Sequence, residues 1–288
     1  MGKKTKFFIL IAFFILFFIN PKLIYAKDIK FVVAGHIYPG VEYPDVLESF
    51  VSQVNETKPD AVFILGDSVK RGTEKEWQIL NQYLSQIEVP FFFVPGNHDL
   101  HGGSTASKLW MEHVGYLHKS VIIGDYKFIL LNSSPNLIKY ELSKEEIEFL
   151  KKELEDYQNF KQVFLMFHHE LWLYPHINWE EKLYPIVKGK VTNVFSGNSG
   201  SYFFSKFSYD KNLKYYLIGF PFLEYDRRKS PTYLLVNTKD VETEINLVLV
   251  DVPIDSTYYE IKPQEKKDFQ ETMVDYIKKF QIKINEFG

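Results

Sequence analysis

Five short apolar runs recur along the chain, and each ends abruptly at a glycine or a polar cluster. They are rich in β-branched and aromatic residues, as is typical of strands that are buried on both faces. The runs span residues 29–33, 61–65, 91–94, 163–167 and 191–195. We therefore predict five buried strands.

Apolar residues at helical spacing lie between these runs. In segments 44–55 and 74–87 they recur at intervals of three and four residues, as on the buried face of a surface helix. Ser143 followed by Glu146 is the pattern of a capping box, so we predict that a third helix begins there. The alternation of strand and helix indicates an α/β fold.

The later half of the chain has a different pattern. Segments 213–218, 232–237 and 244–250 alternate or pair like antiparallel strands, and segment 266–287 has the pattern of a terminal amphipathic helix. We predict that these strands form a second sheet and that the helix lies on the surface of the same domain.

The first 26 residues have the pattern of a secretory signal peptide. Lys3, Lys4 and Lys6 precede an apolar run at 7–19, and Ala26 is a small residue at the exit. The run is short for a helix that must cross roughly 30 Å of hydrocarbon. We predict cleavage after Ala26, an extracytoplasmic location and one domain over residues 27–288. An uncleaved N-terminal membrane anchor is the alternative.

Charge narrows the classes of partner. The chain has 34 basic and 37 acidic residues, and residues 1–26 contain four of the lysines and no acid, so cleavage leaves 30 basic residues against 37 acidic ones. An acidic protein is a poor candidate for a nucleic-acid groove, whereas a cation site is compatible with this charge. There is no cysteine, so a disulfide framework and a lipid-modified N-terminus are excluded.

Polar clusters directly follow all five predicted strands: Gly35-His36, Gly66-Asp67, Gly96-Asn97-His98, His168-His169 and Gly197-Asn198. A glycine after a strand is ordinary turn chemistry. In α/β sheets, however, the carboxyl ends of the strands line one crevice, so clusters that are distant in sequence can form a single site. We predict that these five clusters converge.

At these clusters the chain resembles the calcineurin-like metallophosphoesterase superfamily, over about residues 30–252. The family's ordered pattern is Asp-x-His, Gly-Asp, Gly-Asn-His-Asp/Glu, a single His, and Gly-His-x-His. The resemblance implies a four-layer αββα domain, two sheets flanked by helices, with two metals at the strand ends. It also implies site roles: Asp67 as the bridging carboxylate, Asn97 and His168 as second-metal ligands, His98 near the leaving group, and Asp99 as the orienting partner of His98.

The two ends of the family pattern depart from it. Ala34 stands at the position of the first aspartate, which leaves His36 and Asp67 at the first metal. Asn198 and Gly200 stand at the positions of the two last histidines, so the second metal keeps Asn198 only through its amide oxygen. Two cations at close range need carboxylates to offset their repulsion. We predict at most one firmly bound divalent ion, Mn²⁺ or Mg²⁺.

Other candidate residues carry alternatives. His36 is either a ligand or a structural histidine, His169 supports His168, and His101 is an exposed loop residue or a substrate contact. Five acidic residues could replace the lost ligands, although each is expected to be a solvated surface charge: Glu42, Asp45, Glu170, Glu224 and Asp226. Four aromatic residues are expected to pack loops over the sheet: Tyr38, Trp172, Tyr174 and Trp179.

Two functions follow. The first is an exported phosphoesterase that hydrolyses a phosphate mono- or diester with one metal; a phosphorylated small molecule or envelope component is its partner. The second is a non-catalytic family member that binds a phosphorylated ligand or a protein in the cell envelope. Both exclude nucleic acid, and both limit membrane association to the signal peptide.

Overall fold

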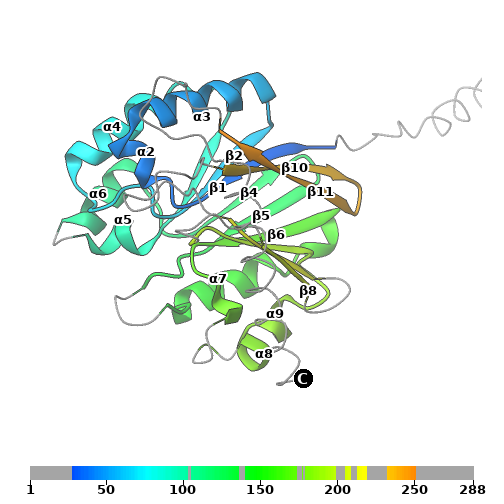
Figure 1. Ribbon diagram of the computed structural model, residues 1–288. Coiled ribbons are helices and arrows are strands. Elements are labelled where there is room, and N and C mark those ends of the chain that lie inside the picture. Colours follow the sequence, from blue (N-terminus) through cyan, green and yellow to red (C-terminus); the bar gives the residue numbers. More distant parts are fainter. Residues whose placement is uncertain are drawn as a thin grey trace, which may run out of the picture.

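The computed structural model describes residues 28–102, 105–135, 140–173, 177, 179–198, 205–208, 213–218 and 232–250. Two sheets lie face to face, and helices cover the outer face of each sheet (Figure 1). The predicted αββα architecture is therefore confirmed. The predicted signal peptide at 1–26 and the predicted terminal helix at 266–287 lie outside the described residues.

The first sheet has the strand order β11-β10-β1-β2-β3. Its parallel centre is built from three of the predicted strands, β1 (Lys30–Ala34), β2 (Ala61–Leu65) and β3 (Phe91–Val94). The hairpin of β10 (Thr232–Lys239) and β11 (Glu242–Leu249) pairs antiparallel with β1. We expected these two late strands to form a second sheet, and that expectation is wrong, because they extend the first one.

The second sheet has the order β4-β5-β6-β7-β9-β8. Its strands are β4 (Lys119–Ile123), β5 (Tyr126–Leu130), β6 (Gln162–Phe167), β7 (Asn193–Ser196), β8 (Ser205–Ser208) and β9 (Lys214–Leu217). Strand β9 lies parallel to β7 and antiparallel to β8, so the antiparallel pattern predicted for this segment holds on one side only. The five predicted strands are thus divided between two sheets.

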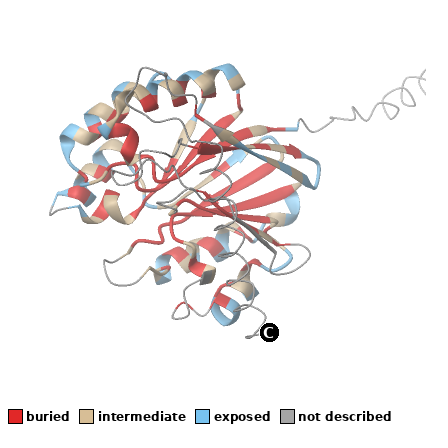
Figure 2. Cartoon of the chain, in the orientation of Figure 1, coloured by how far each residue is buried: buried red, intermediate tan, exposed pale blue. Residues whose placement is uncertain are grey.

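The helices form the two outer layers. The helices on the side of the first sheet are α2 (Tyr38–Glu42), α3 (Pro44–Thr57), α4 (Glu74–Leu84), α5 (Asn97–His101) and α6 (Ala106–His113). Those by the second are α7 (Lys144–Glu153), α8 (Trp179–Lys182) and α9 (Tyr184–Val187), with 3₁₀ turns η1 (Tyr157–Asn159) and η2 (Leu171–Leu173). Figure 2 shows buried strands at the centre and helices buried on their inner faces.

The helix starts differ from the sequence expectation in one respect. At α7, the Ser143 hydroxyl accepts a hydrogen bond from the backbone N–H of Glu146 (3.3 Å), as in a capping box. The Glu146 carboxylate instead accepts from the backbone N–H of Asn132 (3.0 Å) and pairs with His118 (2.8 Å). A complete capping box occurs at α4, between Thr73 and Glu76.

Aromatic side chains fill the space between the two sheets. Between the sheets, the Phe31 ring makes edge contacts with Phe63, Phe128 and Phe164, at centroid distances of 5.7, 5.0 and 5.2 Å. Such edge-to-face pairs add to the area that aromatic rings bury. Within the described residues, no helix has both the length and the apolar character needed to cross a bilayer.

Candidate metal centre

Close backbone contact brings the strand ends of the two sheets together. A Cβ added to Gly35, after β1, would lie 2.5 Å from the Cα of Gly197, after β7, and one added to Gly197 would lie 2.0 Å from the carbonyl oxygen of Leu65. Real side chains cannot approach this closely, so only glycine fits. The polar clusters of both sheets consequently share one site, as the sequence predicts.

Three side chains form the centre of this site. The carboxylate oxygen Oδ2 of Asp67 lies 3.1 Å from Nδ1 of His36 and 3.2 Å from Nε2 of His168. All three residues are buried. Within the described part of the chain, Asp67 is the polar partner of both imidazole nitrogens. Two buried imidazole nitrogens that face one carboxylate oxygen are a donor set that suits a divalent cation.

The backbone around these side chains is unusual. Asp67 and His36 both have positive φ angles, 52° and 60°. For residues other than glycine this region is sparsely populated, and such strain is concentrated at functional sites. Gly66 has φ 80°, and a Cβ there would lie 2.5 Å from Nδ1 of His168. The Gly-Asp turn thus needs glycine to admit the histidine ring.

The electrostatics of Asp67 and His168 favour an ionised carboxylate beside a protonated imidazole. Burial alone would raise the pKa of Asp67, but the charge and hydrogen bond of His168, with a hydrogen bond from His36, hold that pKa well below its usual value. Burial likewise opposes protonation of His168, but Asp67 outweighs it and the pKa of His168 is raised. Nδ1 of His168 donates to the Leu65 carbonyl (2.7 Å), so Nε2 is the atom that faces Asp67.

The donor set fits a divalent ion. Ligand atoms bound at about 2.1 Å, at right angles to each other, are separated by about 3 Å, close to the observed 3.1 and 3.2 Å. The ligand atoms of His36, Asp67 and His168 all lie within 4.8 Å of one another. By resemblance His36 and His168 belong to different metals, whereas the structure places both against the same oxygen.

Asn97 lies beside this group and is held by His169. Oδ1 of Asn97 lies 3.0 Å from Nε2 of His169, and burial, followed by the charge of His168, lowers the pKa of His169 to about 2. His169 is therefore neutral, and its Nε2–H donates to Asn97. A carbonyl oxygen has a second lone pair, which remains for a cation.

His98 and Asp99 have separate partners. Nδ1 of His98 donates to the backbone carbonyl of Lys70 (2.7 Å), and its backbone N–H donates to Asp67 Oδ1 (3.0 Å). Asp99 is fully buried and accepts from three backbone N–H groups, those of Ser68, Val69 and Gly96. Burial and the charge of Asp67 raise the pKa of Asp99 to about 7.

These contacts change the role predicted for Asp99. The expected orienting contact between Asp99 and His98 is replaced by the Lys70 carbonyl. Asp99 instead fixes the turn that carries Lys70, because it accepts from the backbone N–H groups of Ser68 and Val69, the two residues immediately before Lys70. Asp99 also accepts from the backbone N–H of Gly96 and so holds the turn that carries His98.

The positions that depart from the family pattern have structural partners of their own. Ala34 is fully buried in the apolar cluster under α3 and α4. The amide nitrogen of Asn198 donates to Glu170 (2.9 Å), so Glu170 is not merely a solvated charge. Gly200, His176, Tyr174, Glu224 and Asp226 lie outside the described residues.

Some neighbours of the site were not anticipated from the sequence. The Tyr38 ring contacts those of both His36 and His98, at centroid distances of 4.7 and 5.1 Å, rather than packing a loop. Glu42 pairs with Lys70 (2.7 Å) at its rim. His101 is half-buried and donates to the Ser134 carbonyl (3.0 Å), so the expected exposed loop position is wrong. The sequence signal that could have placed Tyr38 at the site was its position two residues after His36.

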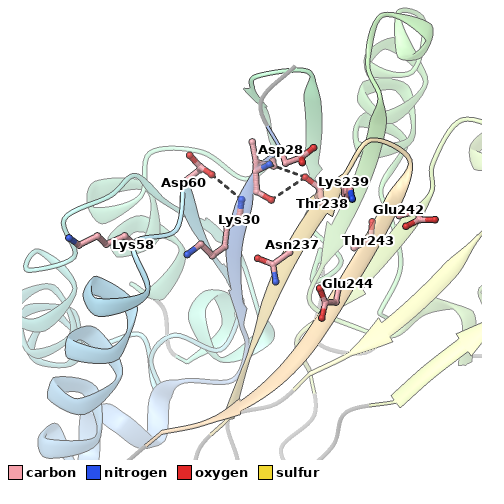
Figure 3. Close-up of a pocket in the computed structure, with 11 residues that line it drawn as sticks. Asp28, Lys30, Lys58, Asp60, Asn237, Thr238, Lys239, Glu242, Thr243 and Glu244 are labelled. Atoms are coloured by element: carbon pink, nitrogen blue, oxygen red, sulfur yellow. Dashed lines mark hydrogen bonds between the residues drawn. The ribbon is translucent and has the colours of Figure 1, made fainter. Parts of the chain in front are cut away.

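A hollow of about 610 Å³ lies at the other end of the first sheet (Figure 3). Its lining includes Lys30, the first residue of β1, and Asn237, which pairs with Lys30 in β10. Lys30 Nζ donates a hydrogen bond to the Thr57 carbonyl (2.6 Å). None of the candidate metal ligands lines this hollow, so it is separate from the site at the strand ends.

Comparisons with known proteins agree with this geometry. A family model described as calcineurin-like phosphoesterase matches residues 28–277. The chain belongs to this family. Among solved structures, this family member is similar to a purple acid phosphatase from yellow lupin (TM-score 0.59, 14% identity, 82% of this chain and 53% of that one). It is also similar to a dimetal phosphatase from Danio rerio (TM-score 0.56, 12% identity, 77% and 99%). These two matches show the fold.

Two curated relatives are phosphodiesterases by name. A probable glycerophosphodiester phosphodiesterase GpdQ from Arcobacter nitrofigilis is 32% identical over 143 residues, which cover 46% of this chain and 50% of the relative. A 3',5'-cyclic-nucleotide phosphodiesterase from Nostoc sp. is 27% identical over 133 residues, 45% of this chain and 49% of the relative. The calcineurin-like chain thus matches about half the length of these relatives.

Proposed function

We propose that this calcineurin-like phosphoesterase hydrolyses a phosphate diester with a single divalent ion held by His36, Asp67 and His168. The observation that supports the proposal is the pair of buried imidazole nitrogens that face one Asp67 oxygen. Asn97 supplies a further oxygen at the edge of this group. The phosphodiesterase relatives favour a diester over a monoester.

The protein groups around the ion divide the work. When bound, a divalent ion supplies positive charge for the phosphoryl oxygens and makes water a better nucleophile. His98 is held through Nδ1–H by the Lys70 carbonyl, and in its imidazolium form it would carry a second proton on Nε2 for the leaving oxygen. The Tyr38 ring packs on His98 and His36 and limits how far either ring can turn.

Mn²⁺ fits the donor set better than Mg²⁺. Imidazole suits the transition metals, whereas Mg²⁺ prefers oxygen ligands and keeps several waters. Two imidazoles and one carboxylate therefore give a site with more nitrogen than the sequence indicated. Position 34, where the family has a carboxylate, is a buried alanine, and this supports a count of one ion.

The test is Mn²⁺ titration of metal-free protein, followed by turnover of an activated aryl phosphodiester. We expect one ion per chain, and we expect Asp67→Asn to remove binding and turnover while the protein stays folded. Asp28→Asn, at an exposed position, is the matched control and should change neither. Two ions per chain would contradict the single-ion site. One bound ion without turnover would favour the non-catalytic alternative.

We also propose that the protein acts outside the cytoplasm on a phosphorylated small molecule or an envelope component. The support is the basic start, the apolar run and the small residue Ala26. Intact-mass measurement of the exported protein should give a chain that begins at Lys27. A mass that includes residues 1–26 would indicate a membrane-anchored form instead.

A further inference from the structure

A buried carboxylate outside the metal site is unexplained by its helix. Glu146, in the first turn of α7, is only 4% exposed. At this position an acid could complete a capping box with Ser143, yet its carboxylate has other partners. One oxygen contacts Nδ1 of His118 (2.8 Å), and the other accepts from the backbone N–H of Asn132 (3.0 Å). Burial of a carboxylate is costly, so these contacts need a further reason.

The contact to Asn132 fixes the loop that follows β5. Oδ1 of Asn132 accepts from the backbone N–H of Ser134 (2.8 Å), which closes the loop on itself. Ser133 and Ser134 are both fully buried. A loop of three buried polar residues, tied at its start by a carboxylate from another element, has a defined position relative to α7.

The same loop surrounds one side of His169. The Ser133 hydroxyl accepts from the backbone N–H of His169 (2.9 Å) and lies 3.1 Å from its Nδ1, and the Ser134 hydroxyl lies 3.3 Å from Nδ1. The Ser133 carbonyl also lies 3.1 Å from Nδ1. Two hydroxyls that can donate and one carbonyl that can only accept compete for this nitrogen, so the loop position decides whether Nδ1 carries the proton.

The opposite nitrogen of His169 contacts Asn97. With Nδ1 accepting from the serine hydroxyls, Nε2–H donates to Oδ1 of Asn97 at the observed 3.0 Å. With the proton on Nδ1, Nε2 would accept from the Asn97 amide nitrogen, and the amide would have to turn. Tyr140 stacks on the His169 ring (3.7 Å, 13°) and prevents the ring from escaping this choice by rotating.

We propose that Glu146 is a positioning residue for the metal centre, which sets the tautomer of His169 through the Asn132–Ser134 loop and thereby turns the Asn97 oxygen toward the ion. The inference rests on the proposed single-ion site. Hydrogen-bond partners behind metal ligands typically change metal affinity by about 10- to 100-fold when they are removed.

The test compares Mn²⁺ dissociation constants of Glu146 variants. Glu146→Leu keeps the size of the side chain but leaves the Asn132 N–H without its acceptor, and we expect the dissociation constant to rise about 10-fold or more. Glu146→Gln still offers an oxygen to Asn132 and should bind within about 2-fold of the unmodified protein. Glu148→Leu, at an exposed position on the same helix, is the matched control and should have no effect.

Two further variants separate positioning from general destabilisation. Leu150→Ala removes a buried side chain of α7 and should lower the melting temperature without weakening Mn²⁺ binding. In the double variant of Glu146→Leu and His169→Ala, the dissociation constant should match that of His169→Ala alone, because Glu146 acts through His169. Additive effects, or equal weakening by Leu150→Ala, would overturn the proposal.

A measurement on metal-free protein keeps the inference independent of metal binding. The ¹⁵N chemical shifts of the His169 ring report which nitrogen carries the proton. We expect Glu146→Leu to move these shifts and Glu148→Leu to leave them unchanged. Unchanged shifts in Glu146→Leu would overturn the inference even if Mn²⁺ binds. If the shifts move but no Mn²⁺ binds to the unmodified protein, the proposed function fails and the positioning contact stands.

Discussion

At the scale of single residues, Asp67 combines several polar contacts with an unusual backbone conformation. One carboxylate oxygen faces two imidazole nitrogens and the other accepts the backbone N–H of His98. The residue also has a positive φ angle. Strain of about 1 to 3 kcal/mol at such a position persists only where the surrounding contacts fix it. Here the glycine before it and the buried histidines provide those contacts.

His98 should matter for turnover and not for metal binding, because its ring is outside the group of His36, Asp67 and His168. We expect His98→Ala to lower the turnover of an aryl phosphodiester by about 10²- to 10⁴-fold and to leave the Mn²⁺ dissociation constant unchanged. His113→Ala, which removes a histidine stacked on Trp77, is the control. Turnover that is insensitive to His98→Ala would indicate a contaminating activity.

The pH dependence of stability should reveal Glu146. Burial raises its pKa, and the contacts from His118 and Asn132 offset only part of that effect. The folded protein thus holds this proton more tightly than the unfolded chain, so the contribution of Glu146 to stability is greatest below its usual pKa and falls as pH rises through the raised pKa. Glu146→Gln cannot ionise. Urea unfolding should show the variant gaining stability relative to the unmodified protein as the pH rises above the usual glutamate pKa of about 4.3.

A matched exposed position provides the control for this pH dependence. Glu148→Gln, on the solvent side of α7, should give a stability difference that does not change over the same range. A pH-independent difference for Glu146→Gln would mean that the carboxylate is as well solvated in the folded protein as in the unfolded chain.

At the scale of elements, the two helix starts make a comparison. At α4, Glu76 accepts from the backbone N–H of Thr73 (2.9 Å) and the Thr73 hydroxyl accepts from Glu76 (3.4 Å), so both halves of the capping box form. At α7 only the serine half forms, because Glu146 is engaged elsewhere. The same sequence pattern therefore has two structural outcomes.

The complete box should be worth more than the half box. We expect Thr73→Ala to lower the free energy of unfolding by about 1 kcal/mol and Ser143→Ala to lower it by less, as measured by urea unfolding. Lys75→Ala, exposed in the first turn of α4, controls for surface truncation. A larger loss in Ser143→Ala would show that the serine hydroxyl supports more than the helix start.

At the scale of the whole molecule, the sandwich interior holds the two halves of the site together. Phe31 in the first sheet contacts Phe128 and Phe164 in the second, while the glycine contact between Gly35 and Gly197 joins the sheets at the strand ends. Asp67, after β2, and His168, after β6, meet because the packing of the two sheets brings these strand ends together.

Removal of the Phe31 ring should therefore affect the whole molecule. We expect Phe31→Ala to destabilise the protein by about 3 to 5 kcal/mol, because the ring packs against both sheets and its loss leaves a cavity. Calorimetry should show one cooperative transition at a lower temperature. Ile122→Ala, 58% exposed on β4, should change stability little. Equal effects of the two variants would contradict a tightly packed interior.

Local signals in the sequence were sufficient for the elements and for the location of the site. Apolar runs identified the strands around Val33, Leu65 and Phe167, and the Gly-Asp and Gly-Asn-His-Asp patterns marked Asp67 and His98, because periodicity and turn chemistry depend on neighbouring residues. Only the tertiary structure decided which strands share a sheet, since β10 pairs with β1 although the two strands lie far apart in the sequence. It also placed His36 and His168 on one oxygen and turned Glu146 from a helix cap to the loop behind His169. These contacts join residues far apart in sequence, and local patterns contain no information about such distances.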